Sequence, residues 1–236
     1  STPTPEISDT FSVPEFFPLV ADSLWYYVGI PEEGGSAEDN FTWEQKGTKA
    51  VGDKTATIIQ TTTDESTDAR NGDQDFWYVE AGTLYYKGYR NGTEKVIGSG
   101  FAQIRIPPQD IVFSPGLAVG GTQKVGDSVS SAGTAQVNIV TFLGPSTVTA
   151  NVSTNVTYDR FDASVNTPLG QFMNVLHLTL SIDASVSGQP INLRGNEFWL
   201  KKNVGMVKQD QDPDPDDAQV QGIESGQVGG QSIVAN

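Results

Sequence analysis

Apolar and polar side chains alternate with a period of two along much of the chain. Between Val148 and Tyr158, apolar or small side chains occupy every second position, and polar ones lie between them. The stretch from Leu176 to Asp183 repeats this pattern with leucine and isoleucine. Because successive side chains of a strand point to opposite faces of a sheet, both stretches predict long antiparallel strands with one buried and one wet face.

Turn residues divide the rest of the chain into shorter strands. Asn91-Gly92 separates residues 84–89 from 94–97, and this dipeptide readily adopts the two positive φ angles of a type I′ hairpin. Ala81-Gly82 is expected to join the strand at 76–79 to the strand at 84–89. With 25 glycines and 13 prolines, the chain is interrupted too often for a helical bundle. Further strands are expected at 25–30, 41–45, 55–62, 101–106, 135–142 and 197–200.

These elements predict an all-β chain, either a large antiparallel curved sheet or a β-sandwich or half-barrel, with extended terminal segments. We expect an N-terminal segment at 1–15, a β-domain at 16–208 and an acidic, then Gly/Gln-rich C-terminal segment at 209–236. The composition of the C-terminal segment predicts disorder after Val207. Prolines and glycines at 106–116 predict a crossover between sheets of one domain, with a linker between two domains as the alternative.

The charge of the chain excludes several classes of partner. Acidic residues outnumber basic ones 29 to 14, giving a net charge of −15. Nucleic acids and anionic membrane surfaces are bound largely through Lys and Arg, so neither is expected as a partner. The chain has no cysteine, which excludes disulfides and thiolate chemistry. It also has no apolar stretch of about 18 residues, so no membrane span is expected.

Alternating aspartates near the C-terminus form the best candidate for a metal site. Oxygen ligands at alternate positions can converge on Ca²⁺. Pro215 stands where an EF-hand loop requires glycine, so the segment does not match that pattern. The alternative is an acidic linker stiffened by proline. The candidate ligands are Asp210, Asp212, Asp214, Asp216 and Asp217.

Signatures of catalysis are weak. His177 is the single histidine, and alternation places it on the polar face of its strand as a surface residue. No Gly-x-Ser-x-Gly motif provides a nucleophilic serine. Asp75, Glu80 and Glu197 lie beside aromatic residues, but solvated strand positions are expected for them. The sequence therefore predicts that the chain is not an enzyme.

Four Asn-x-Ser/Thr sequons predict N-glycosylation in an organism that has the machinery, with chance matches as the alternative. The sequons start at Asn40, Asn91, Asn151 and Asn155. Asn151 and Asn155 fall on the predicted wet face of their strand. Neighbouring aromatic residues such as Tyr85 and Tyr86 must point to opposite faces, so one of each pair is expected in the core and the other at a surface or interface.

Each end of the chain contains a short strand-like run. The candidate assembly residues are Thr10, Phe11 and Val13 near the start and Ile233 and Val234 near the end. An extended segment can add a strand to the sheet of a neighbouring copy. Repeated head-to-tail addition of this kind produces fibres. The alternative is packing of both ends within their own chain.

Three short motifs carry a resemblance to a known class of proteins. They are Phe-Phe-Pro-Leu at 16–19 followed by Leu-Trp-Tyr-Tyr at 24–27, Thr-Pro-Leu-Gly-Gln-Phe at 167–172, and Phe-Trp-Leu at 198–200 followed by Val-Gly-Met-Val-Lys at 204–208. In these motifs the chain resembles secreted bacterial β-rich surface proteins and lipoproteins of unassigned function, which are similar to lipoprotein-carrier half-barrels. The resemblance implies an extracellular or cell-surface location and brings no catalytic residues with it.

The sequence thus predicts a non-enzymatic extracellular structural protein, a subunit of a surface filament or matrix assembled by strand or terminal-segment exchange. One alternative is a carrier of a lipid or other hydrophobic ligand on a curved sheet. Another is a carbohydrate-binding module. The expected partners are further copies of the chain, a hydrophobic ligand or a glycan, and no cofactor other than Ca²⁺ is expected.

Overall fold

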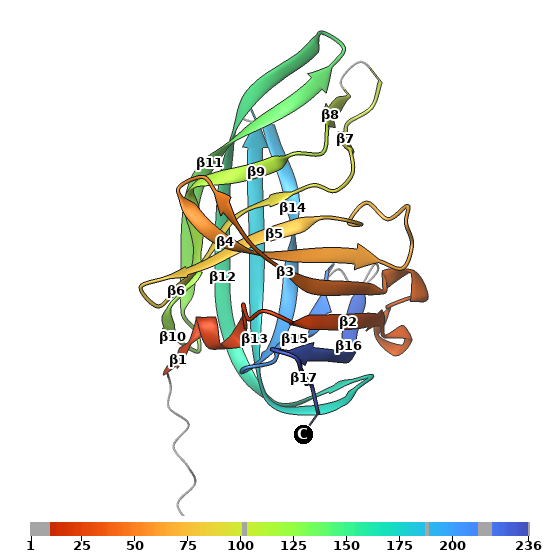
Figure 1. Cartoon of the computed structure of the whole chain (residues 1–236), viewed down its shortest axis with the longest axis vertical. Helices are drawn as coiled ribbons and strands as arrows, with labels where there is room; N and C mark the ends of the chain where they lie inside the picture. Colours follow the sequence, from red (N-terminus) through yellow and green to blue (C-terminus); the bar gives the residue numbers. More distant parts are fainter. Residues whose placement is uncertain (1–9, 101–102, 187–188, 212–218, 236) are drawn as a thin grey trace, which may run out of the picture.

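The computed structural model describes residues 10–100, 103–186, 189–211 and 219–235 (Figure 1). Three short 3₁₀ turns are η1 (Val13–Phe16), η2 (Pro31–Glu33) and η3 (Ala37–Asp39). No helix within the described ranges is long and apolar enough to cross a membrane. The strands are β1 (Thr10–Ser12), β2 (Leu24–Gly29), β3 (Phe41–Val51), β4 (Lys54–Thr63), β5 (Gln74–Glu80), β6 (Thr83–Arg90), β7 (Lys95–Ile97), β8 (Ile104–Ile106), β9 (Asp110–Gly120), β10 (Thr122–Lys124), β11 (Ser128–Thr141), β12 (Gly144–Thr167), β13 (Gly170–Val186), β14 (Gln189–Lys201), β15 (Gly205–Asp210), β16 (Val220–Val228) and β17 (Gln231–Ser232).

One large antiparallel sheet closes on itself into a 12-strand barrel. The ring runs β12-β13-β14-β15-β16-β2-β3-β4-β5-β6-β9-β11, and β11 pairs with β12 to complete it. The closing pair extends from Ser128↔Thr157 to Thr141↔Gly144 without a register shift. Each ring strand therefore has a neighbour on both sides. The expected all-β class and curved sheet are confirmed, and the closure goes further than the expected half-barrel.

The long alternating stretches of the sequence form β12 and β13, which pair with each other along most of their lengths. On β12, Val152, Val156 and Tyr158 are buried, while Asn151 and Asn155 are exposed. The predicted buried and wet faces are therefore confirmed on this strand. The largest fully buried side chains come from β-strands all around the ring: Tyr27, Tyr158, Phe41, Phe76, Phe113, Phe172, Leu84, Leu117, Leu176, Leu178, Leu200 and Ile223.

One of the two expected hairpins forms and the other does not. Ala81 and Gly82 have φ angles of 49° and 78°, and they join the paired strands β5 and β6 as predicted. The hairpin expected at Asn91-Gly92 is wrong, because β6 pairs with β5 and β9 whereas β7 pairs with β8. A local dipeptide cannot specify which strands become neighbours when the ring offers β6 two other partners.

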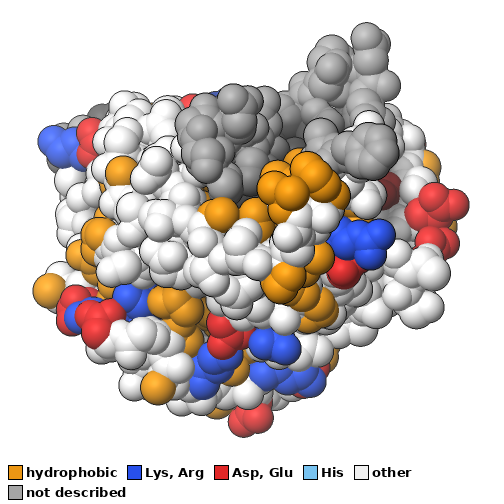
Figure 2. Space-filling view, turned by 90° about the horizontal axis from the view of Figure 1, so that it is seen from above, with side chains coloured by type: hydrophobic (Ala, Val, Ile, Leu, Met, Phe, Trp, Pro, Cys, Tyr) orange, Lys and Arg blue, Asp and Glu red, His pale blue; other side chains and the backbone are white. Residues whose placement is uncertain are grey.

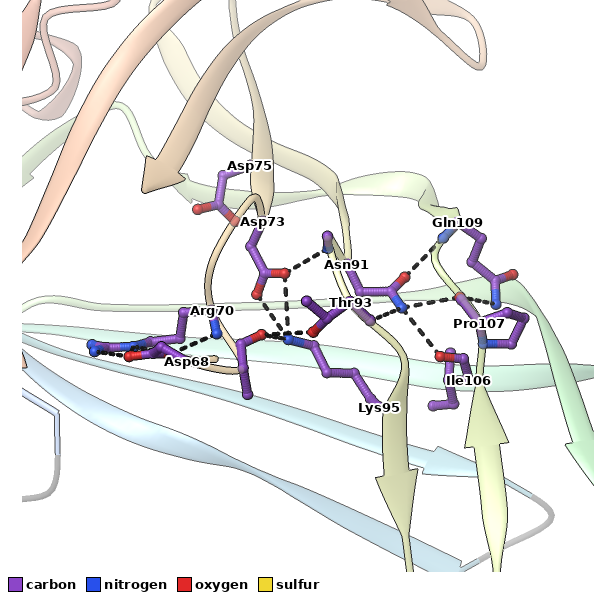
Figure 3. A network of polar contacts seen from close by, with 12 residues as sticks. Asp68, Arg70, Asp73, Asp75, Asn91, Thr93, Lys95, Ile106, Pro107 and Gln109 are labelled. Carbon is purple, nitrogen blue, oxygen red and sulfur yellow. Dashed lines mark hydrogen bonds and ion pairs between the residues drawn. The ribbon is translucent and has the colours of Figure 1, made fainter. Parts of the chain in front are cut away.

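Asn91 instead links the connection between β6 and β7 to the connection between β8 and β9 by hydrogen bonds (Figure 3). Its side chain is fully buried. Nδ2 donates hydrogen bonds to the carbonyl oxygens of Thr93, Ile106 and Pro107 at 2.9, 3.3 and 3.0 Å, and Oδ1 accepts one from the backbone N–H of Gln109 at 3.0 Å. A glycan on Asn91 is incompatible with this arrangement, so the prediction of a glycosylation site there is wrong for the folded chain.

The segment expected to cross between two sheets is part of the single barrel. Residues 110–120 form β9, which pairs with β6 and contacts β11 in the ring. The β6–β9 register moves from Tyr86↔Leu117 to Gly88↔Val112, so four residues of β9 bulge opposite Lys87. Such a bulge accommodates Pro115, which has no N–H to donate to a sheet. Pro115 thus marks an irregularity within one strand, whereas Pro107 and Pro108 lie in the connection between β8 and β9.

The C-terminal segment completes the barrel, so the expectation of disorder is wrong for the described residues 219–235. Strand β16 lies between β15 and β2, where its backbone is hydrogen-bonded on both sides. Ile223 is buried in the barrel core, and Val220 is buried on the other face of the strand. The polar composition predicted disorder, but the two strands beside β16 bond its backbone on both sides. These hydrogen bonds do not depend on apolar side chains.

Both candidate assembly segments are engaged within their own chain. In β1, Thr10 and Phe11 pair with Lys124 and Gln123 of β10, and β17 pairs with β16. The assembly residues that follow differ in exposure: Val13 and Ile233 are buried in the core, whereas Val234 is 74% exposed. The structure therefore realises the alternative of intramolecular packing, and exchange between copies stays a prediction.

Replacing Asn91 with alanine should destabilise the fold strongly. The substitution removes every hydrogen bond of the side chain and leaves buried carbonyl groups without a donor, so we expect a loss of about 2–4 kcal/mol in the free energy of unfolding. Asn151→Ala on the exposed face of β12 is the matched control, with an expected change within about 0.5 kcal/mol. Urea unfolding measures both, and equal small losses would contradict the role assigned to Asn91.

Candidate functional site

The barrel contains an apolar cavity of about 70 Å³. Its walls come from β2, β3, β4, β5, β13, β14 and β15 and from the segment that follows η1. The aliphatic part of the lining comprises Pro18, Leu19, Ile59, Leu180, Leu200 and Met206, next to Gly205. The aromatic part comprises Phe17, Trp25, Tyr27, Trp43, Trp77 and Phe198.

Strand alternation directs the aromatic residues of β2 into the barrel. Trp25 and Tyr27 are buried, whereas the intervening Tyr26 is partly exposed and donates a hydrogen bond to Asp64 at 3.0 Å. Trp25 Nε1 donates to the carbonyl oxygen of Val204 at 2.7 Å, and the Tyr27 hydroxyl donates to that of Met206 at 2.9 Å. Because the polar atoms of both rings are bonded to the backbone, their apolar surfaces are left to line the cavity.

Ring-to-ring contacts hold the cavity walls in place. Phe17, from the segment after η1, stacks on Trp77 with ring centroids 5.6 Å apart. Trp77 in turn lies 4.6 Å from Tyr86, and Tyr27 contacts Trp43 edge-on at 5.7 Å. Such aromatic pairs contribute energy beyond their buried area and fix the orientation of the rings. The cavity is therefore largely preformed.

Asp75 is the one charged residue among the described residues that line the cavity. It lies on β5, and the Tyr86 hydroxyl of the neighbouring strand β6 donates a hydrogen bond to its Oδ1 at 2.5 Å. No hydrogen bond from a described residue reaches Oδ2. Asp75 is thus an acidic residue in an otherwise apolar lining.

Burial raises the pKa of Asp75 to about 6. The hydrogen bond from Tyr86 lowers this pKa by less than the loss of solvation raises it, and the charge of Asp73 raises it further. Figure 3 shows Asp73 next to Asp75 at the edge of the polar network. Asp73 accepts a hydrogen bond from the backbone of Gly92 at 2.7 Å and forms an ion pair with Lys95. Its own pKa is raised, again chiefly by burial.

Asp75 is half-buried and lines the cavity, so the expectation of a solvated strand position is wrong. Phe76, the next residue, points to the other face of β5, where it packs with Val51 and Ala56 in a small separate core. Both faces of β5 are thus apolar, so alternation alone did not reveal which face turns into the barrel. Glu80, in contrast, is exposed and pairs with Lys54, as a solvated strand position predicts.

His177 is buried rather than at the surface, since only 4% of it is exposed. Its ring stacks on Trp199 at 4.6 Å and lies 3.3 Å from a carboxylate oxygen of Glu197 and 3.7 Å from one of Asp159. Alternation does place it on the opposite face of β13 from the core residue Leu178. The aromatic ring of the adjacent strand covers it there, which the pattern of a single strand cannot show.

Of the predicted calcium ligands, Asp210 lies at the end of β15, and Asp212, Asp214, Asp216 and Asp217 lie outside the described residues. Within the described part of the chain, no group of three or more acidic, histidine or cysteine residues is arranged to hold a metal ion. The calcium site stays a prediction.

A second, polar cleft of about 750 Å³ lies where the loop between β4 and β5 approaches η3 and β7. Its cations are already paired: Arg70 bonds to Asp68 at 2.7 Å, and Lys95 to Asp73 at 3.2 Å. Because these cations are paired with acidic residues of the same chain, the cleft is a weaker candidate for a ligand-binding site than the apolar cavity.

The remaining sequons differ in their surroundings. Asn151 and Asn155 are exposed on β12, as predicted. Asn40 is half-buried, and its Oδ1 accepts a hydrogen bond from the backbone N–H of Gly29 at 3.0 Å. Modification of all three residues stays a prediction.

Hydrophobic side chains are exposed at the turn that joins β11 to β12. Phe142 and Leu143 are 71% and 83% exposed, and Val96 of β7 is also exposed. Figure 2 looks onto this end of the molecule and shows a hydrophobic cluster among scattered charged side chains. Exposed apolar patches on a surface mark contact sites for other molecules.

Two solved structures are similar to the chain. One is described as a putative lipoprotein from Parabacteroides distasonis ATCC 8503, with a TM-score of 0.46 and 12% identity over 90% of this chain and 98% of that one. The other is described as a putative exported protein with YmcC-like fold from Bacteroides fragilis NCTC 9343, with a TM-score of 0.45 and 12% identity over 88% of this chain and 96% of that one. No model of a known protein family and no curated protein matches the sequence.

Stability should fall as the pH rises through the range in which Asp75 ionises. A pKa raised from 3.8 to about 6 means that, between about pH 4 and 6, the folded chain holds a proton that the unfolded chain has released. The contribution of Asp75 to the free energy of unfolding therefore declines across this interval and levels off above it. Asp75→Asn should remove this contribution to the decline and raise stability at about pH 8 by up to 3 kcal/mol.

Urea unfolding of both proteins at several pH values measures this effect. Asp183→Asn, which changes an exposed aspartate on β13, should keep the wild-type pH profile. Parallel profiles for the wild type and Asp75→Asn would show that Asp75 is not buried in the way the structure indicates.

Proposed function

We propose that the chain is a non-enzymatic, extracellular or cell-surface protein that binds a compact ligand inside its barrel. The preformed aromatic cavity is the observation that carries this proposal. The location follows what the sequence resemblance implies. Among the functions that the sequence predicts, this proposal corresponds to the carrier of a lipid or other hydrophobic ligand. It restricts the ligand to a small molecule.

The size of the cavity narrows the ligand class. Pockets for drug-sized ligands usually measure about 300–1,000 Å³, and an apolar cavity of about 150 Å³ holds one benzene molecule. A space of about 70 Å³ therefore suits a molecule or terminal group of a few non-hydrogen atoms. A whole lipid acyl chain is too large for this space.

The positions of Asp75 and His177 support a role in binding without catalysis. Hydrolysis of glycosides requires two carboxyl groups that flank the substrate, whereas the described lining of the cavity offers only Asp75. His177 lies on the other face of β13, away from the cavity, with its ring stacked on Trp199.

The other predicted functions have less support from the geometry. Strand exchange would first have to break the pairing of β1 with β10 and of β17 with β16. The filament role stays a prediction, which electron microscopy of native material tests. A sugar platform needs an exposed row of aromatic rings, but Trp25, Trp43 and Trp77 face the interior cavity.

A substitution that fills the cavity should abolish binding without unfolding the protein. Leu180 lines the cavity and is only partly buried, so Leu180→Phe adds volume at a tolerant position. Small molecules of three to six non-hydrogen atoms, both neutral and charged, are added to isotope-labelled protein. The indole N–H signals of Trp25, Trp43 and Trp77 should shift in the wild type and stay unchanged in Leu180→Phe.

Two internal controls accompany this measurement. Trp199, whose Nε1 donates to Asp162 at 2.9 Å, does not line the cavity, so its signal should not move. Val79→Phe adds the same kind of ring at an exposed position of β5 and should bind like the wild type. If no member of the panel shifts the three signals, the proposed function is wrong.

A further inference from the structure

We infer that the ligand of the cavity is a small organic cation, an alkylated ammonium group held between the aromatic walls and the carboxylate of Asp75. This inference rests on the proposed function and deepens it, because it names the chemistry that the site selects. Three features of the cavity carry it: a carboxylate oxygen to which no described residue donates, walls made largely of aromatic rings, and the absence of a cationic residue from the described lining.

The first feature is a negative charge that the protein itself does not neutralise. Tyr86 satisfies Oδ1 of Asp75, but a hydroxyl carries no countercharge. The described lining contains no lysine, arginine or histidine. An isolated carboxylate in an apolar space is costly unless it is paired. A bound cation would supply the missing charge, and an N–H of an ammonium group can donate to Oδ2.

The second feature is the composition of the walls. Cations bind over the negative faces of aromatic rings, most strongly over tryptophan, and methylated ammonium ions are held in cages of such rings. Trp25, Trp43 and Trp77 all line this cavity. The Trp25 and Tyr27 polar atoms are already bonded to backbone carbonyls. The rings therefore present apolar, negatively polarised faces to methyl groups and positive charge, and Trp25 and Tyr27 have no polar atom left to bond a sugar.

Other ligand classes fit the same surroundings poorly. A neutral apolar molecule would fill the space and leave the carboxylate of Asp75 without a partner. An anion would be repelled by it. Calcium takes six to eight oxygen ligands, whereas among the described lining residues only Asp75 has a carboxylate side chain. A small alkylammonium ion satisfies both the charge and the apolar walls.

A matched pair of probes tests the inference. Trimethylammonium and isopropanol each have four non-hydrogen atoms in the same branched shape, but only the first carries charge. Both are titrated at about pH 7.5, where alkylamines are protonated and Asp75 is ionised, while the indole signals of Trp25, Trp43 and Trp77 are followed. We expect trimethylammonium to bind at least about tenfold more tightly than isopropanol.

The variant Asp75→Asn should weaken trimethylammonium about tenfold and change isopropanol within about twofold. Asp183→Asn should bind both probes like the wild type. Equal affinities for the two probes, or an unchanged preference in Asp75→Asn, would overturn the inference and leave the proposed function standing. Binding of neither probe nor any other member of the panel would overturn both. The preference of the wild type for trimethylammonium over isopropanol is measured without any substitution. It therefore tests the inference even if Asp75→Asn does not fold.

Discussion

The pairing of β11 with β12 is the constraint on which the rest of the structure depends. This pairing closes the ring, so every ring strand has a paired strand on both sides. Closure also creates an interior that side chains must fill. The aromatic and branched residues of β2, β5, β9, β12 and β13 fill most of that space. What they leave is the small cavity, so the site is a consequence of how the closed sheet is packed.

Closure also explains why Asp75 is unusual. In an open sheet, a strand such as β5 could turn its polar residues to water on one side. In this barrel, Trp77 and Asp75 share the inner side, and Phe76 is covered on the outer side by Val51 and Ala56. The fold thus holds a carboxyl group in a place that costs stability. Positions that break the rules of burial are frequently functional.

The polar network of Figure 3 stabilises the end of the barrel that lies next to this carboxyl group. Asn91 joins the connections before β7 and before β9, and Asp73 bonds to Gly92 and Lys95. These contacts fix the start of β5, on which Asp75 lies two residues after Asp73. The buried polar network of the connections therefore adjoins Asp75 directly, through the first residues of β5.

The sequence by itself determined the all-β class, the long strands β12 and β13 with their faces, and the hairpin at Ala81-Gly82, because these depend on local alternation and turn chemistry. Only the tertiary structure decided that Asn91 is buried, that 110–120 is a ring strand and that β16 completes the barrel. The same holds for Asp75: its neighbours in sequence are apolar on both faces, so its environment depends on which face the closed sheet turns inward. Alternation specifies that two faces differ, whereas partners from distant strands determine which of them is the interior.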